Sequence, residues 1–82
     1  MKRQYRFAFN ALKKMGVPVF IHRDDENRFD ISAEEINSSE WVNYWHHPEG
    51  WPFGVHPKID EVLSLRGLHA EWINAGHLRV YE

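Results

Sequence analysis

The last fifteen residues constrain the fold more than any other part of the chain. Two alternating segments flank Asn74-Ala75-Gly76, a pattern typical of a type I turn followed by a left-handed glycine in a β-hairpin. The register pairs Ile73 with His77, Trp72 with Leu78, Glu71 with Arg79, Ala70 with Val80 and His69 with Tyr81. One face then holds only apolar side chains, namely Leu68, Ala70, Trp72, Leu78 and Val80. We predict a C-terminal hairpin that turns this face toward the core.

The opposite face of this hairpin carries the first candidate contact surface. Its side chains are His69, Glu71, Ile73, His77, Arg79 and Tyr81. We expect Glu71 and Arg79 to form an ion pair across the two strands. Titratable groups at this spacing can serve acid–base catalysis, but a solvated sheet face has the same appearance. Because the chain lacks a nucleophile elbow, a P-loop and a dinucleotide-binding glycine motif, we predict that it is not an enzyme.

Helix and strand periodicity predict the remaining elements. Apolar residues at helical spacing indicate a helix over residues 2–15 that ends at Gly16. Residues 17–23 and 29–31 alternate as a second hairpin around a polar turn, with Ile21 opposite Ile31, Arg23 opposite Phe29 and His22 opposite Asp30. Capping serines open a helix at about 38–46, and a third helix begins at Pro57.

These elements predict one α+β domain spanning residues 1–82. Their order is α-β-β-α-α-β-β, with an antiparallel sheet built from two hairpins and helices packed on one face. Whether the two hairpins share one sheet is left open by the sequence. A chain of 82 residues has room for a single hydrophobic core.

Composition excludes several classes of protein. The absence of cysteine rules out disulfide staples, thiolate zinc sites and cysteine nucleophiles. No apolar run reaches the length of about 20 residues that spans a bilayer, and no signal-peptide pattern opens the chain. We therefore expect a cytoplasmic protein without a membrane partner. Its size and aromatic content favour a small accessory protein of a bacterium or phage.

Six histidines raise the alternative of a metal-binding protein. A site could combine His46 or His47 with His56 and Glu49 in one loop. Adjacent histidines seldom point the same way, and the His-Glu-x-x-His pattern is absent. We predict no metal and no cofactor.

Segregated charge raises a second alternative, nucleic-acid binding. The first fourteen residues contain five cations and no acid, whereas residues 24–49 are strongly acidic. A basic helix with an exposed aromatic ring would bind a polyanion through Lys2, Arg3, Arg6, Phe7 and Lys14. The order of the later helices and hairpin is also that of a winged-helix core. The expected recognition helix is, however, poor in Lys and Arg.

Protein recognition is the function that the sequence favours. Aromatic residues make up 15% of the chain, and interface centres are rich in such residues. Trp51 and Phe53 lie in a loop that contains three prolines, which lower the entropy cost of ordering them. We predict a non-catalytic module that binds another protein through this loop and the open hairpin face, with homodimerisation through either surface as an alternative.

Overall fold

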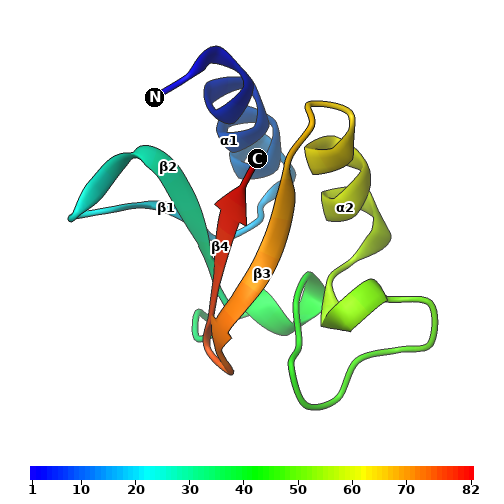
Figure 1. Ribbon diagram of the computed structural model, residues 1–82. Coiled ribbons are helices and arrows are strands. Elements are labelled where there is room, and N and C mark those ends of the chain that lie inside the picture. Colours follow the sequence, from blue (N-terminus) through cyan, green and yellow to red (C-terminus); the bar gives the residue numbers. More distant parts are fainter.

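Two helices cover one face of a four-stranded antiparallel sheet, and the other face carries no helix (Figure 1). The computed structural model describes residues 1–82. Its elements are α1 (Arg3–Met15), β1 (Val19–His22), β2 (Asp25–Ser32), α2 (Pro57–Ser64), β3 (His69–Asn74) and β4 (His77–Tyr81), with 3-10 turns at Ser38–Glu40 and Pro52–Gly54. The predicted α+β class and order of elements are confirmed, with the first of these turns at the start of the expected second helix. Neither helix combines the length and apolar character needed to cross a bilayer.

The two hairpins share one sheet because β2 pairs with β4. The strand order is β1-β2-β4-β3, so the edges are β1 and β3. Ile31 lies opposite Leu78 at the β2–β4 junction, and both side chains are fully buried. This pairing answers the question that the sequence left open.

The core lies between the sheet and the helices. Helix α1 contributes Tyr5, Ala8 and Leu12, the stripe predicted by its periodicity. It ends at Gly16, whose φ of 96° is the left-handed conformation that favours glycine. The core members are Tyr5, Ala8, Leu12, Val17, Phe29, Ile31, Val42, Val55, Ile59, Leu63, Leu68, Leu78 and Val80.

The register of the first hairpin differs from the prediction. Val19, and not Ile21, lies opposite Ile31, and Phe20 lies opposite Asp30. A shift of two residues keeps the inward face unchanged, so hydrophobic alternation alone could not distinguish the two registers. At the turn His22 lies opposite Asp25, and an irregularity of the strand between Phe20 and His22 separates this pair from the register of Val19 and Phe20. Ile21, which lies at this irregularity, is exposed.

The predicted helix at 38–46 is wrong beyond its first turn. The chain leaves the 3-10 turn at Trp41 and pairs with the segment before α2. Val42 bridges Val55, the amide of Asn43 donates to Gly54 at 2.8 Å, and the amide of His56 donates to the Trp41 carbonyl at 2.8 Å. These long-range bonds replace the local bonds of a helix. The winged-helix interpretation therefore loses the helix on which it depended.

The C-terminal hairpin confirms the predicted register from His69 to Trp72 and departs from it at the turn. Asn74, and not Ile73, lies opposite His77, because the strand bulges between Trp72 and Asn74. The Asn74 side chain accepts a hydrogen bond from the amide of Gly76 at 2.9 Å and closes the turn. Gly76 is not left-handed. It is instead a site of close approach, because a Cβ there would lie 2.2 Å from the carboxylate of Glu34.

Candidate functional site

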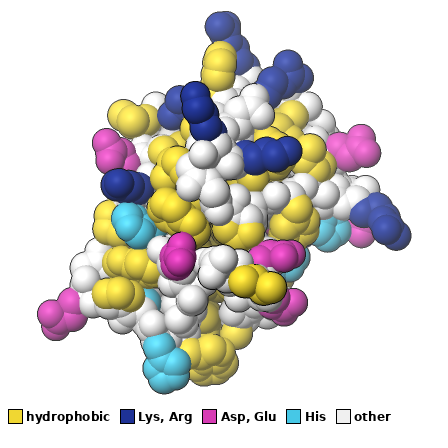
Figure 2. All heavy atoms as spheres, turned by 180° about the vertical axis from the view of Figure 1, so that it is seen from behind, with side chains coloured by type: hydrophobic (Ala, Val, Ile, Leu, Met, Phe, Trp, Pro, Cys, Tyr) yellow, Lys and Arg dark blue, Asp and Glu magenta, His cyan; other side chains and the backbone are white.

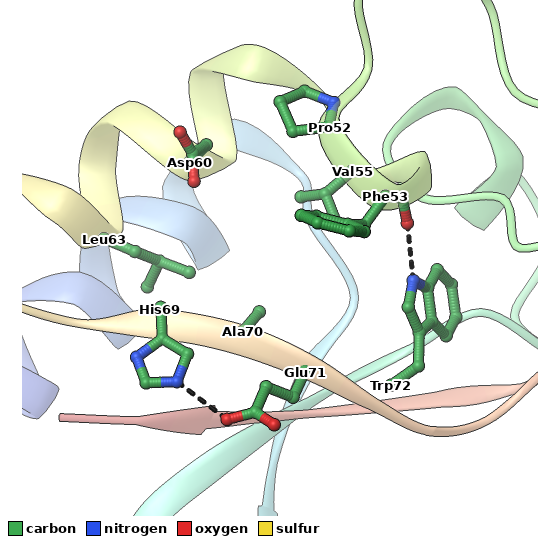
Figure 3. Close-up of a pocket in the computed structure, with 9 residues that line it drawn as sticks. All are labelled: Pro52, Phe53, Val55, Asp60, Leu63, His69, Ala70, Glu71 and Trp72. Atoms are coloured by element: carbon green, nitrogen blue, oxygen red, sulfur yellow. Dashed lines mark hydrogen bonds and ion pairs between the residues drawn. The ribbon is translucent and has the colours of Figure 1, made fainter.

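A pocket of about 470 Å³ lies beside the edge strand β3 and is the strongest candidate site (Figure 3). We call it the β3 pocket. Its walls come from α2, from β3 and from the turn at Pro52–Gly54. The lining residues are Pro52, Phe53, Val55, Asp60, Leu63, His69, Ala70, Glu71 and Trp72.

One hydrogen bond joins the turn to the strand across this pocket. The indole Nε1 of Trp72 donates to the backbone carbonyl of Phe53 at 2.6 Å (Figure 3). This bond gives the indole N–H of the partly buried Trp72 a backbone acceptor. It also fixes the Phe53 backbone, although 87% of that residue is exposed to solvent. An exposed aromatic ring on an anchored backbone is costly to leave in water and loses little entropy on binding.

The conformation of the turn is unusual at two adjacent residues. Phe53 has φ of 53° and Gly54 has φ of 80°, so both adopt the left-handed region. A phenylalanine rarely takes this conformation, because its Cβ crowds the backbone. The local strain is offset by the hydrogen bonds that tie this turn to Trp72 and Asn43. Strain of this kind tends to gather at functional sites.

The β3 pocket is apolar at its base and acidic at its rim. Val55, Leu63 and Ala70 supply apolar surface, while the carboxylates of Asp60 and Glu71 lie on α2 and β3. No Lys or Arg lines the pocket. His69 is held by Glu71, with 2.8 Å between Nε2 and the carboxylate (Figure 3). The pocket therefore suits a ligand that combines an apolar group with a positive charge.

The structure brings only part of the predicted contact surface to this pocket. Phe53, His69 and Glu71 line it. Trp51 does not, because its ring packs on His56, with 5.2 Å between ring centroids, and Trp41 packs on the same imidazole. Trp51 is thus partly buried, and its ring contributes to the packing of the loop. Ile73 is half-exposed at the far end of β3.

Sequence reasoning missed several members of the pocket. Asp60 and Leu63 belong to α2 and meet β3 only through the tertiary fold. Alternation predicts that Trp72 lies on the core-facing side of the hairpin, which is correct, but it does not indicate the hydrogen bond from Trp72 to Phe53. No local pattern could have shown these contacts, since 19 residues separate the two bonded partners.

Two further predicted residues of the hairpin, His77 and Arg79, form an ionic cluster with Asp30 on the open face, outside the β3 pocket. The expected Glu71–Arg79 ion pair is absent, although the two residues lie opposite each other. Arg79 instead bonds the carboxylate of Asp30 on β2, with 3.1 Å from Nε to Oδ1, and His77 lies 2.5 Å from Oδ2 of the same group. The reason is that Asp30 is fully buried and needs charged partners more than the exposed Glu71 does.

Electrostatics and aromatic contacts reinforce this cluster. The hydrogen bond from Arg79 to Asp30 raises the pKa of the guanidinium above its ordinary value, even though partial burial opposes the shift. Phe20 covers the imidazole of His77, with 5.5 Å between ring centroids. Tyr81 stacks on His69 and carries the guanidinium of Arg28 at 5.2 Å on its ring. The open face is consequently a set of internally paired side chains.

Replacement of Asp30 by alanine should destabilise the protein by about 2 kcal/mol. Loss of one partner from a fully buried ion pair lowers the free energy of unfolding by more than this amount. The effect is smaller here because the side chains of His77 and Arg79 are 24% and 26% exposed and can turn toward water once Asp30 is removed. Urea unfolding followed by circular dichroism would measure the change. Asp25→Asn is the matched control, because the Asp25–Arg28 pair is more exposed and should contribute less than about 1 kcal/mol. Equal effects of the two substitutions would contradict the assignment of Asp30 as the central partner.

The alternative of a metal site in the loop does not correspond to a cluster of ligands in the structure. No group of three or more His, Asp or Glu side chains is arranged to hold a metal ion. The Nδ1 atom of His56 accepts a hydrogen bond from the backbone amide of Lys58 at 3.0 Å and thereby caps the N-terminus of α2. His47 lies with Nδ1 3.2 Å from the carbonyl of Asn43. These imidazoles are engaged in local hydrogen bonds and do not converge with Glu49.

The basic residues of the nucleic-acid alternative lie on and beside α1. Phe7 is half-exposed, and the guanidinium of Arg3 lies 5.4 Å from its ring centroid. Arg3, Arg6 and Phe7 line one shallow depression. Lys2 is bound to Glu82, with 2.7 Å between Nζ and the carboxylate, and Lys14 is exposed at the end of the helix.

Comparisons with models of protein families, with curated proteins and with solved structures gave no match to this chain.

Proposed function

We propose that this chain is a non-catalytic recognition module that binds an extended segment of another protein in the β3 pocket. The observation that carries the proposal is the position of Phe53. Its ring is almost fully exposed, its backbone is anchored by Trp72, and it stands at the rim of an apolar pocket. Interface centres typically use such anchored aromatic residues beside a pocket.

The neighbouring strand supports an extended ligand. β3 is an edge strand whose only partner is β4, so one of its sides lacks a strand neighbour. A peptide in extended conformation can pair with an edge strand and place alternate side chains into adjoining pockets. The β3 pocket lies beside this edge, and Ala70 is both a residue of β3 and part of the pocket lining.

The acidic rim supports a specific chemistry for the segment. Asp60 and Glu71 are both exposed and have no Lys or Arg partner. A Lys or Arg next to an apolar side chain would meet opposite charge at the rim and apolar surface at the base. We therefore expect preferred segments to contain an apolar residue and a cation close together.

Selection of peptides from a displayed random library on the immobilised protein should yield sequences with this combination. Synthetic peptides from the selection should bind with Kd values on the order of micromolar, as is common for single extended segments. Phe53→Asn should weaken them by at least about tenfold. Asparagine tolerates the left-handed backbone at this position, so the substitution removes the ring without straining the turn.

Two further variants separate the charge from the aromatic contact. Asp60→Asn should weaken binding and reduce its dependence on salt, whereas Glu61→Gln, on the same helix but outside the pocket, should not. Ile36→Asn is the control for Phe53, because Ile36 is 90% exposed at a distant turn. Selected peptides that bind Phe53→Asn and the parent protein equally would refute the β3 pocket as the recognition site.

A further inference from the structure

We infer a second binding site, on the outer face of α1, for single-stranded nucleic acid. This site is separate from the β3 pocket and does not depend on it. Four residues at helical spacing form the face, namely Arg3, Phe7, Asn10 and Lys14, and Arg6 flanks them. Arg3, Arg6, Phe7 and Asn10, together with Met1, line a shallow depression.

The exposed ring of Phe7 is the first observation. The other aromatic residues of α1 have a structural role, because Tyr5 and Phe9 pack edge-on against Phe29 in the core. Phe7 makes no such contact and is 50% exposed. Its only close partner of this kind is the guanidinium of Arg3. An exposed aromatic ring beside a guanidinium is the arrangement on which unpaired bases stack.

Charge complementarity is the second observation. No acidic residue occurs before Asp24, so α1 itself carries cations and no acid. The nearest carboxylate in the lining of this surface is that of Glu26, which shares a depression with Arg6 and Asn10 but forms no ion pair with Arg6. Figure 2 views the molecule from the side that carries the two helices, and Lys and Arg side chains gather over its upper part, where α1 lies. The pair between Lys2 and Glu82 occupies one cation, but Arg3, Arg6 and Lys14 form no ion pair within the chain. These three side chains are available for phosphate groups.

The combination favours a single strand over a duplex or a simple polyanion. Bases in a duplex are stacked on one another and offer no free face to Phe7. A polyanion without bases would use the cations but would gain nothing from the ring. The preference for one strand and the contribution of Phe7 are therefore the two properties that identify the ligand.

Fluorescence anisotropy with a labelled 20-nucleotide single strand, at low and rising salt, tests the inference. The parent protein should bind the single strand at low salt, more tightly than a duplex of the same length or a polyphosphate competitor. Phe7→Ala should weaken this binding by about 5-fold to 150-fold, the range that one stacked base contributes. The plot of log affinity against log salt concentration has a negative slope, and Arg6→Gln should make this slope shallower by about 0.7.

Matched controls distinguish a site from general charge. Lys58→Gln removes a cation from α2, and Ile36→Ala removes an exposed apolar side chain, so neither should alter affinity. Phe7→Leu keeps apolar bulk but lacks a ring face and should behave as Phe7→Ala does. Circular dichroism would verify that all variants fold. The inference is overturned if no binding occurs at low salt, if Phe7→Ala binds as the parent does, if Phe7→Leu restores affinity, or if duplex or polyphosphate binds equally well.

Discussion

Replacement of Phe29 by alanine should destabilise the protein by about 3–5 kcal/mol, the largest effect that we expect from any single substitution. Phe29 is fully buried at the centre of the sheet and packs edge-on against Tyr5 and Phe9 from α1. A domain of this length has a total stability on the order of 4–12 kcal/mol. A large fraction of the variant should therefore be unfolded at physiological temperature.

Urea unfolding of the Phe29→Ala variant, followed by circular dichroism, would measure this loss. Phe7→Ala is the matched control, because it removes the same ring from a half-exposed position on α1. Its effect should stay within about 0.5 kcal/mol. A loss below about 1.5 kcal/mol for Phe29→Ala would contradict the central position of this ring.

Replacement of Gly54 by alanine should cost about 3 kcal/mol and also abolish peptide binding in the β3 pocket. Two effects add at this residue. Its φ of 80° disfavours any side chain, and a Cβ would lie 2.3 Å from the backbone carbonyl oxygen of Asn43. The backbone must shift to relieve this contact, and the shift would move the adjacent Phe53 away from the pocket.

Two other glycines separate the conformational cost from the clash. Gly16 has φ of 96° but open space around it, so Gly16→Ala should show the conformational cost alone. Gly76 lacks a positive φ, and the three atoms nearest to an added Cβ all belong to the side chain of Glu34, which can rotate away. Gly76→Ala should therefore have the smallest effect of the three. Urea unfolding of the three variants would test this order, and an effect of Gly54→Ala no larger than that of Gly16→Ala would show that the turn can relax.

In the middle of the chain, local sequence patterns predict a helix that the structure does not contain. Trp41, Tyr44 and Trp45 have helical spacing, yet the segment is not helical. Backbone bonds from Asn43 and His56 to residues more than ten positions away compete with the helix and prevail. Propensity and spacing describe only what a segment prefers by itself.

The open face gives a second example of this limit. The register predicted from alternation placed Glu71 opposite Arg79, and the structure confirms this opposition. The ion pair nevertheless forms with Asp30, which belongs to a strand 49 residues earlier. The sequence could not reveal that competition, because it did not show that β2 lies on the other side of β4.

The amino-acid sequence by itself determined the fold class, both helices, the C-terminal hairpin and the side of each element that faces the core. These features follow from periodicity over a few neighbouring residues and from turn and cap residues such as Gly16 and Pro57. Only the tertiary structure decided the union of the two hairpins, the partner of Arg79 and the β3 pocket. Each of these depends on contacts between segments far apart in the chain, where burial sets which charges must pair and which surfaces remain open.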